Sequence, residues 1–97
     1  MEILDNQSFE EVIKNNNKVI VDFYADWCGP CKMQAPIFLQ ASLERNDCVF
    51  LKVNVDTQRL IARSYNIYSI PTICLFVNGK LTKTLIGLQS KDTLLKL

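Results

Sequence analysis

Residues 19–32 read VIVDFYADWCGPCK and join an apolar run of strand length to a Cys-X-X-Cys motif. The β-branched and aromatic residues from Val19 to Tyr24 predict a central strand that is buried on both faces. Helical spacing of apolar side chains begins at Cys28 or Gly29 and continues to about Glu44. We therefore expect the motif to lie where a buried strand gives way to a helix.

The predicted helix carries its apolar side chains on one side and is interrupted by Pro36. Because proline lacks the N–H that would bond back to the carbonyl of Lys32, we expect a kink in the second turn rather than the end of the helix. The apolar side consists of Met33, Ile37, Phe38 and Ala41.

Before the central strand, the sequence predicts a short strand over Glu2–Leu4 and a helix over residues 9–15. Ser8 followed three residues later by Glu11 is typical of a capping box at the start of such a helix. An apolar stripe then follows at helical spacing. Its members are Phe9, Val12 and Ile13.

After the motif helix, a second buried strand is expected over Phe50–Val55. Asp56 or Thr57 then caps a helix that turns three side chains toward the core. These are Leu60, Ile61 and Tyr65.

The last third of the chain predicts a β-hairpin and a short helix. Thr72–Val77 and Lys80–Ile86 are strands, and the two residues between them, Asn78 and Gly79, tolerate the positive φ of a tight turn. Ser90 caps a final helix. That helix carries Leu94, Leu95 and Leu97.

Helix-separated strands followed by a hairpin predict an α/β fold of order βαβαβαββα. The expected architecture is a mixed central β-sheet with helices on both faces, a three-layer α/β/α sandwich. The sequence has no repeat or low-complexity linker, so residues 1–97 are predicted to form a single domain.

Composition narrows the range of partners. Of the 97 residues, 48% are hydrophobic and 22% charged, and the net charge is +1, which argues against nucleic acid or an anionic membrane as the main partner. The first 17 residues lack the basic start and apolar core of a signal peptide, and the longest apolar runs are strand-sized. We therefore expect a cytoplasmic protein with no membrane-spanning segment.

Cys28 and Cys31 suit reversible thiol chemistry. A cysteine at a helix start faces unpaired N–H groups and the positive end of the helix dipole, both of which favour thiolate over thiol. Two intervening residues in a helical turn bring the cysteines close enough for a disulfide, and Pro30 fits the first turn because its missing N–H costs little there. So small a loop gains only about 2 kcal/mol of chain entropy from the bond, which favours a switchable disulfide over a structural one.

The same spacing also fits half of a zinc site. Its completion would require Cys48 and Cys74, since the chain has no histidine. Both lie within or at the edge of strand patterns, where a free cysteine packs as a small hydrophobe. We predict no metal and no cofactor.

The chain resembles the thioredoxin family over nearly its whole length. Glutaredoxins usually carry Pro-Tyr between the two cysteines and disulfide isomerases Gly-His, whereas this chain has the Gly29-Pro30 pair of thioredoxins. The matching segments, in the family's order, are Ala25–Lys32, the Pro36 kink, Ile70–Thr72, the Asn78–Gly79 turn and Gly87.

Asp22 and Lys52 are candidates for controlling proton transfer. Desolvation inside its strand would raise the pKa of Asp22, and the resemblance implies that this carboxyl is the base for Cys31. Lys52 matches the lysine that tunes this aspartate in the family. The alternatives are a solvent-facing Asp22 at a strand edge and a Lys52 on a solvated strand face.

The resemblance also implies a substrate surface around Cys28. Pro71 matches the family's cis-proline, and the backbone of Ile70 would pair with an extended substrate segment. Trp27, Ile70 and Gly87 would form a flat apolar patch with little sequence preference. Trp27 could instead belong to the core, and Gly87 could be a bulge or a point of close approach for substrate backbone.

As a function, the resemblance implies a thiol–disulfide oxidoreductase that reduces protein disulfides, with Cys28 as the nucleophile and Cys31 as the resolving thiol. It further implies a monomeric electron carrier that a flavin-dependent, NADPH-using thioredoxin reductase recharges. One alternative is a binding module that uses the same apolar patch. Another is an oxidant or isomerase of the same fold with a different redox poise, although Gly29 and Pro30 favour a reductant.

Overall fold

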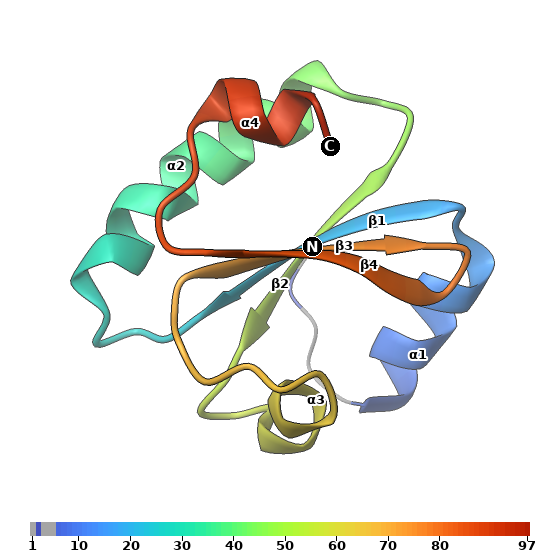
Figure 1. Ribbon diagram of the computed structural model, residues 1–97, viewed down its shortest axis with the longest axis horizontal. Helices are drawn as coiled ribbons and strands as arrows, with labels where there is room; N and C mark the ends of the chain where they lie inside the picture. Colours follow the sequence, from blue (N-terminus) through green and yellow to red (C-terminus); the bar gives the residue numbers. More distant parts are fainter. Residues whose placement is uncertain (1, 3–5) are drawn as a thin grey trace.

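A mixed β-sheet forms the middle of the molecule in the computed structural model, which describes Glu2 and residues 6–97 (Figure 1). From one edge to the other, its strands are β2 (Val49–Asn54), β1 (Lys18–Tyr24), β3 (Thr72–Val77) and β4 (Lys80–Ile86). Strand β1 pairs in parallel with β2 and antiparallel with β3, and β3 pairs antiparallel with β4. The predicted mixed sheet is confirmed.

Helices cover both faces of this sheet. Figure 1 shows α2 (Gly29–Glu44) and α4 (Lys91–Leu95) above it, and α1 (Asn6–Asn15) and α3 (Arg59–Ser64) below it. The three-layer α/β/α arrangement is therefore confirmed. None of the helices that the structure describes is long and apolar enough to cross a membrane.

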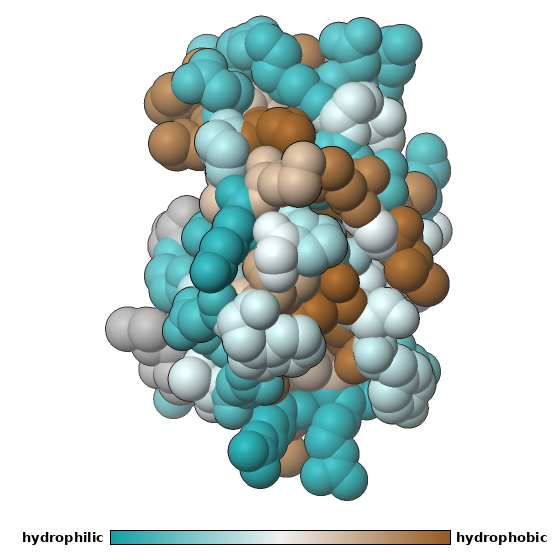
Figure 2. All heavy atoms as spheres, turned by 90° about the vertical axis from the view of Figure 1, so that its left-hand side faces the viewer, coloured by the Kyte–Doolittle hydropathy of each residue, from teal (hydrophilic) through white to brown (hydrophobic). Residues whose placement is uncertain are grey.

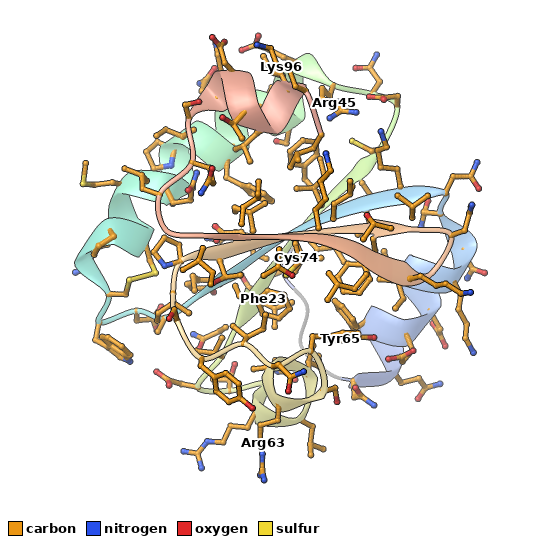
Figure 3. The ribbon with its side chains drawn as sticks, in the orientation of Figure 1. Phe23, Arg45, Arg63, Tyr65, Cys74 and Lys96 are labelled. Carbon is orange, nitrogen blue, oxygen red and sulfur yellow. A yellow bond between two sulfur atoms is a disulfide. The ribbon has the colours of Figure 1, made fainter. Side chains whose placement is uncertain are left out.

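Two hydrophobic cores lie on opposite faces of β1, because successive side chains of a strand point to opposite faces. Val19, Val21 and Phe23 pack with residues of α1 and α3, whereas Ile20 packs with residues of α2 and α4. In Figure 3, Phe23 and Tyr65 lie together on the α1 and α3 side. The interior residues of β1 are buried on both faces, as predicted.

Helix α2 begins at the motif. Cys28 is its N-cap residue, and the Cys28 side chain accepts a hydrogen bond from the backbone N–H of Cys31. The helix continues through Pro36 to Glu44, so proline does not end it, as predicted.

The apolar side of α2 differs from the prediction. Met33 is exposed, and Gln34 takes a place on the buried face. Successive residues of a helix are turned by about 100°, so Met33 points away from the face that Gln34 shares with the other buried residues. They are Cys31, Gln34, Phe38 and Ala41.

The predicted hairpin and last helix are confirmed. Asn78 and Gly79 join β3 to β4 with φ values of 52° and 82°, and this positive φ is the reason for glycine at the second position. The Ser90 side chain accepts a hydrogen bond from the N–H of Thr93 and caps α4, which buries Leu94.

The predicted capping box is wrong. Helix α1 begins at Asn6, so Ser8 lies in its first turn rather than before it. Burial of Phe9 and Ile13 against the sheet fixes the position of this helix. The strand predicted over Glu2–Leu4 lies mostly outside the described residues. Glu2, which the structure does describe, forms an isolated parallel bridge with Lys52.

The predicted cap of α3 is also wrong. The helix begins at Arg59 after Gln58 and has no side-chain cap. The backbone N–H groups of Asp56 and Thr57 instead donate to Asn54 Oδ1, which forms a turn directly after β2. Leu60, predicted to face the core, is exposed, whereas Ile61 is buried as predicted.

Candidate redox site

Cys28 and Cys31 form a disulfide at the start of α2, visible as a yellow bond in Figure 3. Their Cα atoms are 5.2 Å apart, and the N–H of Cys31 lies 3.2 Å from Cys28 Sγ. Each cysteine is only 4% exposed in this oxidised form. Little of Cys28 is therefore open to solvent in the oxidised form.

Two other segments approach this disulfide. The Ile70–Pro71 peptide bond is cis, as the family resemblance implied. The carbonyl oxygen of Ile70 lies 3.8 Å from Cys28 Sγ, a contact rather than a hydrogen bond because a disulfide sulfur carries no hydrogen. The carbonyl of Pro71 in turn accepts a hydrogen bond of 2.8 Å from the N–H of Gly87. The motif, the proline loop and Gly87 therefore belong to one site.

Gly87 follows the last residue of β4 with a φ of 92°, a conformation that favours glycine. A Cβ atom at this position would meet nothing within 4 Å. The bulge interpretation is wrong, since the register shift of the hairpin falls between Leu75 and Phe76. Gly87 thus sets the backbone path beside Pro71 and leaves open space on its outer side.

Asp22 is fully buried on the face of the sheet that α2 covers. Neither of its carboxyl oxygens has a hydrogen-bond partner among the described residues. Desolvation raises the pKa of Asp22 from its ordinary 3.8 to about 7; the positive charge of Lys52 opposes this increase, and Glu2 adds to it. The predicted elevated pKa is confirmed, and the solvent-facing alternative is wrong.

Lys52 lies next to Asp22, because the two are register partners in the parallel pair β1 and β2. It is half-buried, and its Nζ atom lies 4.4 Å from the centre of the Tyr24 ring. This cation–π contact holds the ammonium group near the buried carboxyl. The fully solvated alternative is therefore wrong, and the tuning role of Lys52 stays a prediction.

Trp27 is 71% exposed, so the core alternative is wrong. Its indole N–H donates to Asp56 Oδ2 at 2.8 Å, which fixes the ring over the turn after β2. Figure 2 shows hydrophobic residues gathered in the middle of the face that carries the start of α2. Exposed apolar and aromatic side chains flanking the three segments of the site are Trp27, Tyr68, Ile86 and Leu88.

Gln34 and Asp56 were not identified as site residues from the sequence. Gln34 is fully buried, and both ends of its amide pair with the backbone of Gln89. Its signal in the sequence was a polar residue three positions after Cys31, on the same side of a helix. Asp56 gave no such signal, because its partner Trp27 is 29 residues away.

Cys48 and Cys74 do not join the site. Cys74 is fully buried in the core beneath α1 and α3, as predicted, and burial raises the pKa of its thiol to about 11. Cys48 is half-buried against the core of α2 and α4, and burial raises its thiol pKa as well. Since they lie on opposite faces of the sheet, they cannot complete a zinc site with the motif, and no metal-binding group of His, Cys, Asp and Glu occurs among the described residues.

Comparisons with known proteins identify relatives over nearly the whole chain and solved structures with the same fold. The thioredoxin family model matches residues 1–97. The chain is 46% identical to a thioredoxin of Mycoplasma genitalium over 96 residues, which are 99% of this chain and 94% of that one. It is also 42% identical over 97 residues to a bifunctional thioredoxin reductase/thioredoxin of Mycobacterium leprae, covering 99% of this chain and 21% of that protein.

Solved structures agree with these relatives. A structure of Plasmodium falciparum thioredoxin superimposes with a TM-score of 0.91 at 39% identity, covering 98% of this chain and 91% of that one. The matches extend over the whole sheet, its helices and the cysteine pair. The chain therefore belongs to the thioredoxin family and is a thiol–disulfide oxidoreductase that works by dithiol–disulfide exchange through Cys28 and Cys31.

Proposed function

We propose that the protein reduces disulfides of other proteins and that Cys28 is the attacking thiol. The observation that carries this assignment is the N-cap position of Cys28, whose sulfur accepts the N–H of Cys31. A sulfur in this position is stabilised as thiolate by that N–H and by the positive end of the α2 dipole. Cys31 lies inside the first turn of α2, where it is suited to the resolving step.

The reaction proceeds in two exchanges. The Cys28 thiolate attacks one sulfur of the substrate disulfide, forms a mixed disulfide and releases the first substrate thiolate. Cys31 then attacks Cys28 Sγ, which closes the Cys28–Cys31 disulfide and releases the second substrate thiolate. The substrate gains two electrons, and its two thiolates take up two protons: one from solvent, to which Cys28 lost its proton, and one that Cys31 gives up by way of Asp22. The protein dithiol is oxidised to the disulfide.

Asp22 takes up the proton of Cys31 in the second exchange. A pKa of about 7 suits a general base at neutral pH, because it is available in both protonation states. Burial on the side of the sheet that α2 covers keeps this proton away from bulk water. Lys52 limits the rise of the Asp22 pKa and so keeps the carboxyl in the useful range.

Protein substrates lie across the face that Trp27 and Gly87 flank. An extended substrate segment forms backbone hydrogen bonds with Ile70 beside Pro71, in the way that a peptide adds a strand to the edge of a sheet. The space beside Gly87 lets that backbone approach closely. Gly29 and Pro30 fix the geometry of the first turn, and Gly-Pro between the cysteines favours the reducing direction.

The partner that restores the dithiol is a flavin-dependent thioredoxin reductase that uses NADPH. Support comes from the Mycobacterium leprae relative, whose name joins a thioredoxin reductase and a thioredoxin in one polypeptide. We further propose that the chain acts as a monomer in the cytoplasm.

The decisive experiment uses single cysteine variants with insulin as the protein disulfide. Cys31→Ser should accumulate a mixed disulfide with insulin through Cys28, detectable by mass spectrometry, because the resolving thiol is gone. Cys28→Ser should lose turnover with dithiothreitol as electron donor, and Cys48→Ser is the matched control that should keep it. Retained turnover in Cys28→Ser would overturn the proposal, whereas a binding module with incidental cysteines would bind its partner unchanged in this variant.

A further inference from the structure

Gln34 is a polar residue on the buried face of α2, three residues after Cys31. Its Nε2 atom donates to the carbonyl of Gln89 at 3.1 Å, and its Oε1 atom accepts the N–H of Gln89 at 2.7 Å. The amide therefore pairs with the backbone of Gln89 as a neighbouring strand would. Both ends of a fully buried side chain are satisfied by one residue 55 positions away.

From Gln89, the contacts continue toward the redox site. The Gln89 side chain donates to the carbonyls of Ile86 and Gly87 at 3.3 and 3.2 Å. Gly87 donates to the carbonyl of Pro71 at 2.8 Å, and the preceding carbonyl, that of Ile70, contacts Cys28 Sγ at 3.8 Å. A continuous set of contacts thus runs from the helix that carries Cys31 to the backbone beside Cys28.

Few other contacts hold the segment that joins β4 to α4. Only three residues, Gly87–Gln89, lie between the end of β4 and Ser90, the cap of α4. Gly87 has the broad conformational freedom of glycine, and Leu88 is exposed. Without Gln34, the N–H and C=O of Gln89 would lose their partners inside the protein and would turn toward water.

We propose that Gln34 is a positioning residue for protein substrates: it holds the Gly87–Gln89 segment in place, so that Leu88 and Ile86 form one side of the substrate surface. This inference rests on the proposed function. A protein substrate covers that segment as well as the sulfur, whereas a small disulfide needs only the sulfur. Gln34 therefore affects the recognition of proteins and leaves the thiol chemistry unchanged.

The test compares insulin with the small disulfide 5,5′-dithiobis(2-nitrobenzoic acid) in the variant Gln34→Leu, which keeps the volume and removes both hydrogen bonds. We expect about a tenfold higher KM for insulin, the size of effect that loss of two hydrogen bonds produces. The kcat with insulin, the rate with the small disulfide and the reduction potential should stay within about twofold, the range of a surface substitution.

Two further variants keep the test independent of stability. Phe38→Leu, on the same buried face, should lower the unfolding midpoint without changing the KM for insulin. Gln34→Met also approximates the volume and removes both bonds to the backbone of Gln89, so it should raise that KM even if Gln34→Leu does not fold. An unchanged KM in both Gln34→Leu and Gln34→Met, or in Gln34→Met alone where Gln34→Leu is unfolded, would overturn the inference.

A parallel loss toward insulin and the small disulfide would also overturn it, since that result indicates a change at the sulfur. Insulin turnover by the unsubstituted protein distinguishes a failure of this inference from a failure of the proposed function. If it does not turn over insulin, the proposed function fails; if it does, and the variants keep its KM, only the role of Gln34 fails.

Discussion

Asp22 combines complete burial with two carboxyl oxygens that have no hydrogen-bond partner among the described residues. An ionised carboxylate in this position loses its hydration and gains only the charge of Lys52 in return. Because desolvation is the largest contribution, the protonated form is favoured up to about pH 7. The same property that suits Asp22 to proton transfer therefore reduces the stability of the fold at neutral pH.

We predict that the unsubstituted protein loses stability as pH rises and that Asp22→Asn lacks this loss. Between the ordinary pKa of 3.8 and the native value of about 7, the folded state binds more protons than the unfolded state, so the free energy of unfolding falls as pH rises. The shift corresponds to up to about 4 kcal/mol. Asp22→Asn should lack this loss, so urea unfolding at pH 4.5 and pH 8.5 should show its relative stability increasing with pH.

Asp26→Asn is the matched control, since Asp26 is exposed two residues beyond Tyr24, the end of β1. It should follow the unsubstituted protein at both pH values. If Asp22→Asn shows the same pH dependence as the unsubstituted protein, the carboxyl does not titrate in the way that its burial indicates.

Residues of the site could be predicted from the sequence where their signal is local. Cys28 and Cys31 are separated by two residues, and Asp22 stands out against its apolar neighbours on β1. Gln34 and Asp56 could not be predicted, because each acts through a partner on a distant element. Pairing over such separations depends on the tertiary fold: the sequence shows that Gln34 is a polar residue on the same side of the helix as Cys31, but it does not show the partner, Gln89.

At the scale of elements, α2 positions both the redox pair and the core that supports it. Its first turn carries the disulfide, and the following turns bury Phe38 against Phe50 of β2, with ring centres 5.1 Å apart. The next residue, Leu39, is 58% exposed although it is equally apolar. The face that a helix buries is thus set by its direction on the sheet as well as by hydrophobicity.

We predict that alanine substitutions at these two adjacent positions differ strongly in stability. Phe38→Ala should lower the free energy of unfolding by about 3–5 kcal/mol, because it leaves a cavity between α2 and the sheet. Leu39→Ala, its matched control, should change it by less than about 0.5 kcal/mol. Urea unfolding followed by circular dichroism measures both, and equal losses would show that α2 is rotated from its described orientation.

Element boundaries that depend on local chemistry were predicted well, such as the hairpin turn at Asn78 and Gly79. The start of α3 was not predicted, because Asp56 and Thr57 lie in a turn in which their own backbone N–H groups donate to Asn54 Oδ1. Asn54, Asp56 and Thr57 all have side chains that can accept backbone N–H groups in this turn. The structure uses Asn54, the last residue of β2. A prediction from capping residues alone cannot rank such alternatives.

At the scale of the whole molecule, the fold class followed from the order of strands and helices. Buried runs separated by amphipathic helices require a sheet covered on both sides, and the hairpin adds antiparallel strands to it. The relative positions of Cys28, Ile70 and Gly87 follow from that topology. Their contact distances could not be predicted, since they depend on packing among three separate loops.

We predict that the oxidised protein is more stable than the reduced protein by about 2 kcal/mol, because the disulfide closes a short loop in the unfolded chain. Urea unfolding at pH 7, with and without a phosphine reductant, measures the difference. The double variant Cys28→Ser/Cys31→Ser is the control and should not respond to the reductant. A more stable reduced form would indicate an oxidant, since stabilisation of the dithiol makes its disulfide strongly oxidising.

The reduction potential of the Cys28–Cys31 couple tests the reducing function most directly. Equilibration of the protein in glutathione buffers, with free thiols counted by mass after alkylation, gives this value. We predict a potential at or below the cytosolic glutathione poise of about −240 mV, at which the dithiol can donate electrons to protein disulfides. A potential of about −180 mV or higher would contradict a reductase and indicate disulfide formation or isomerisation.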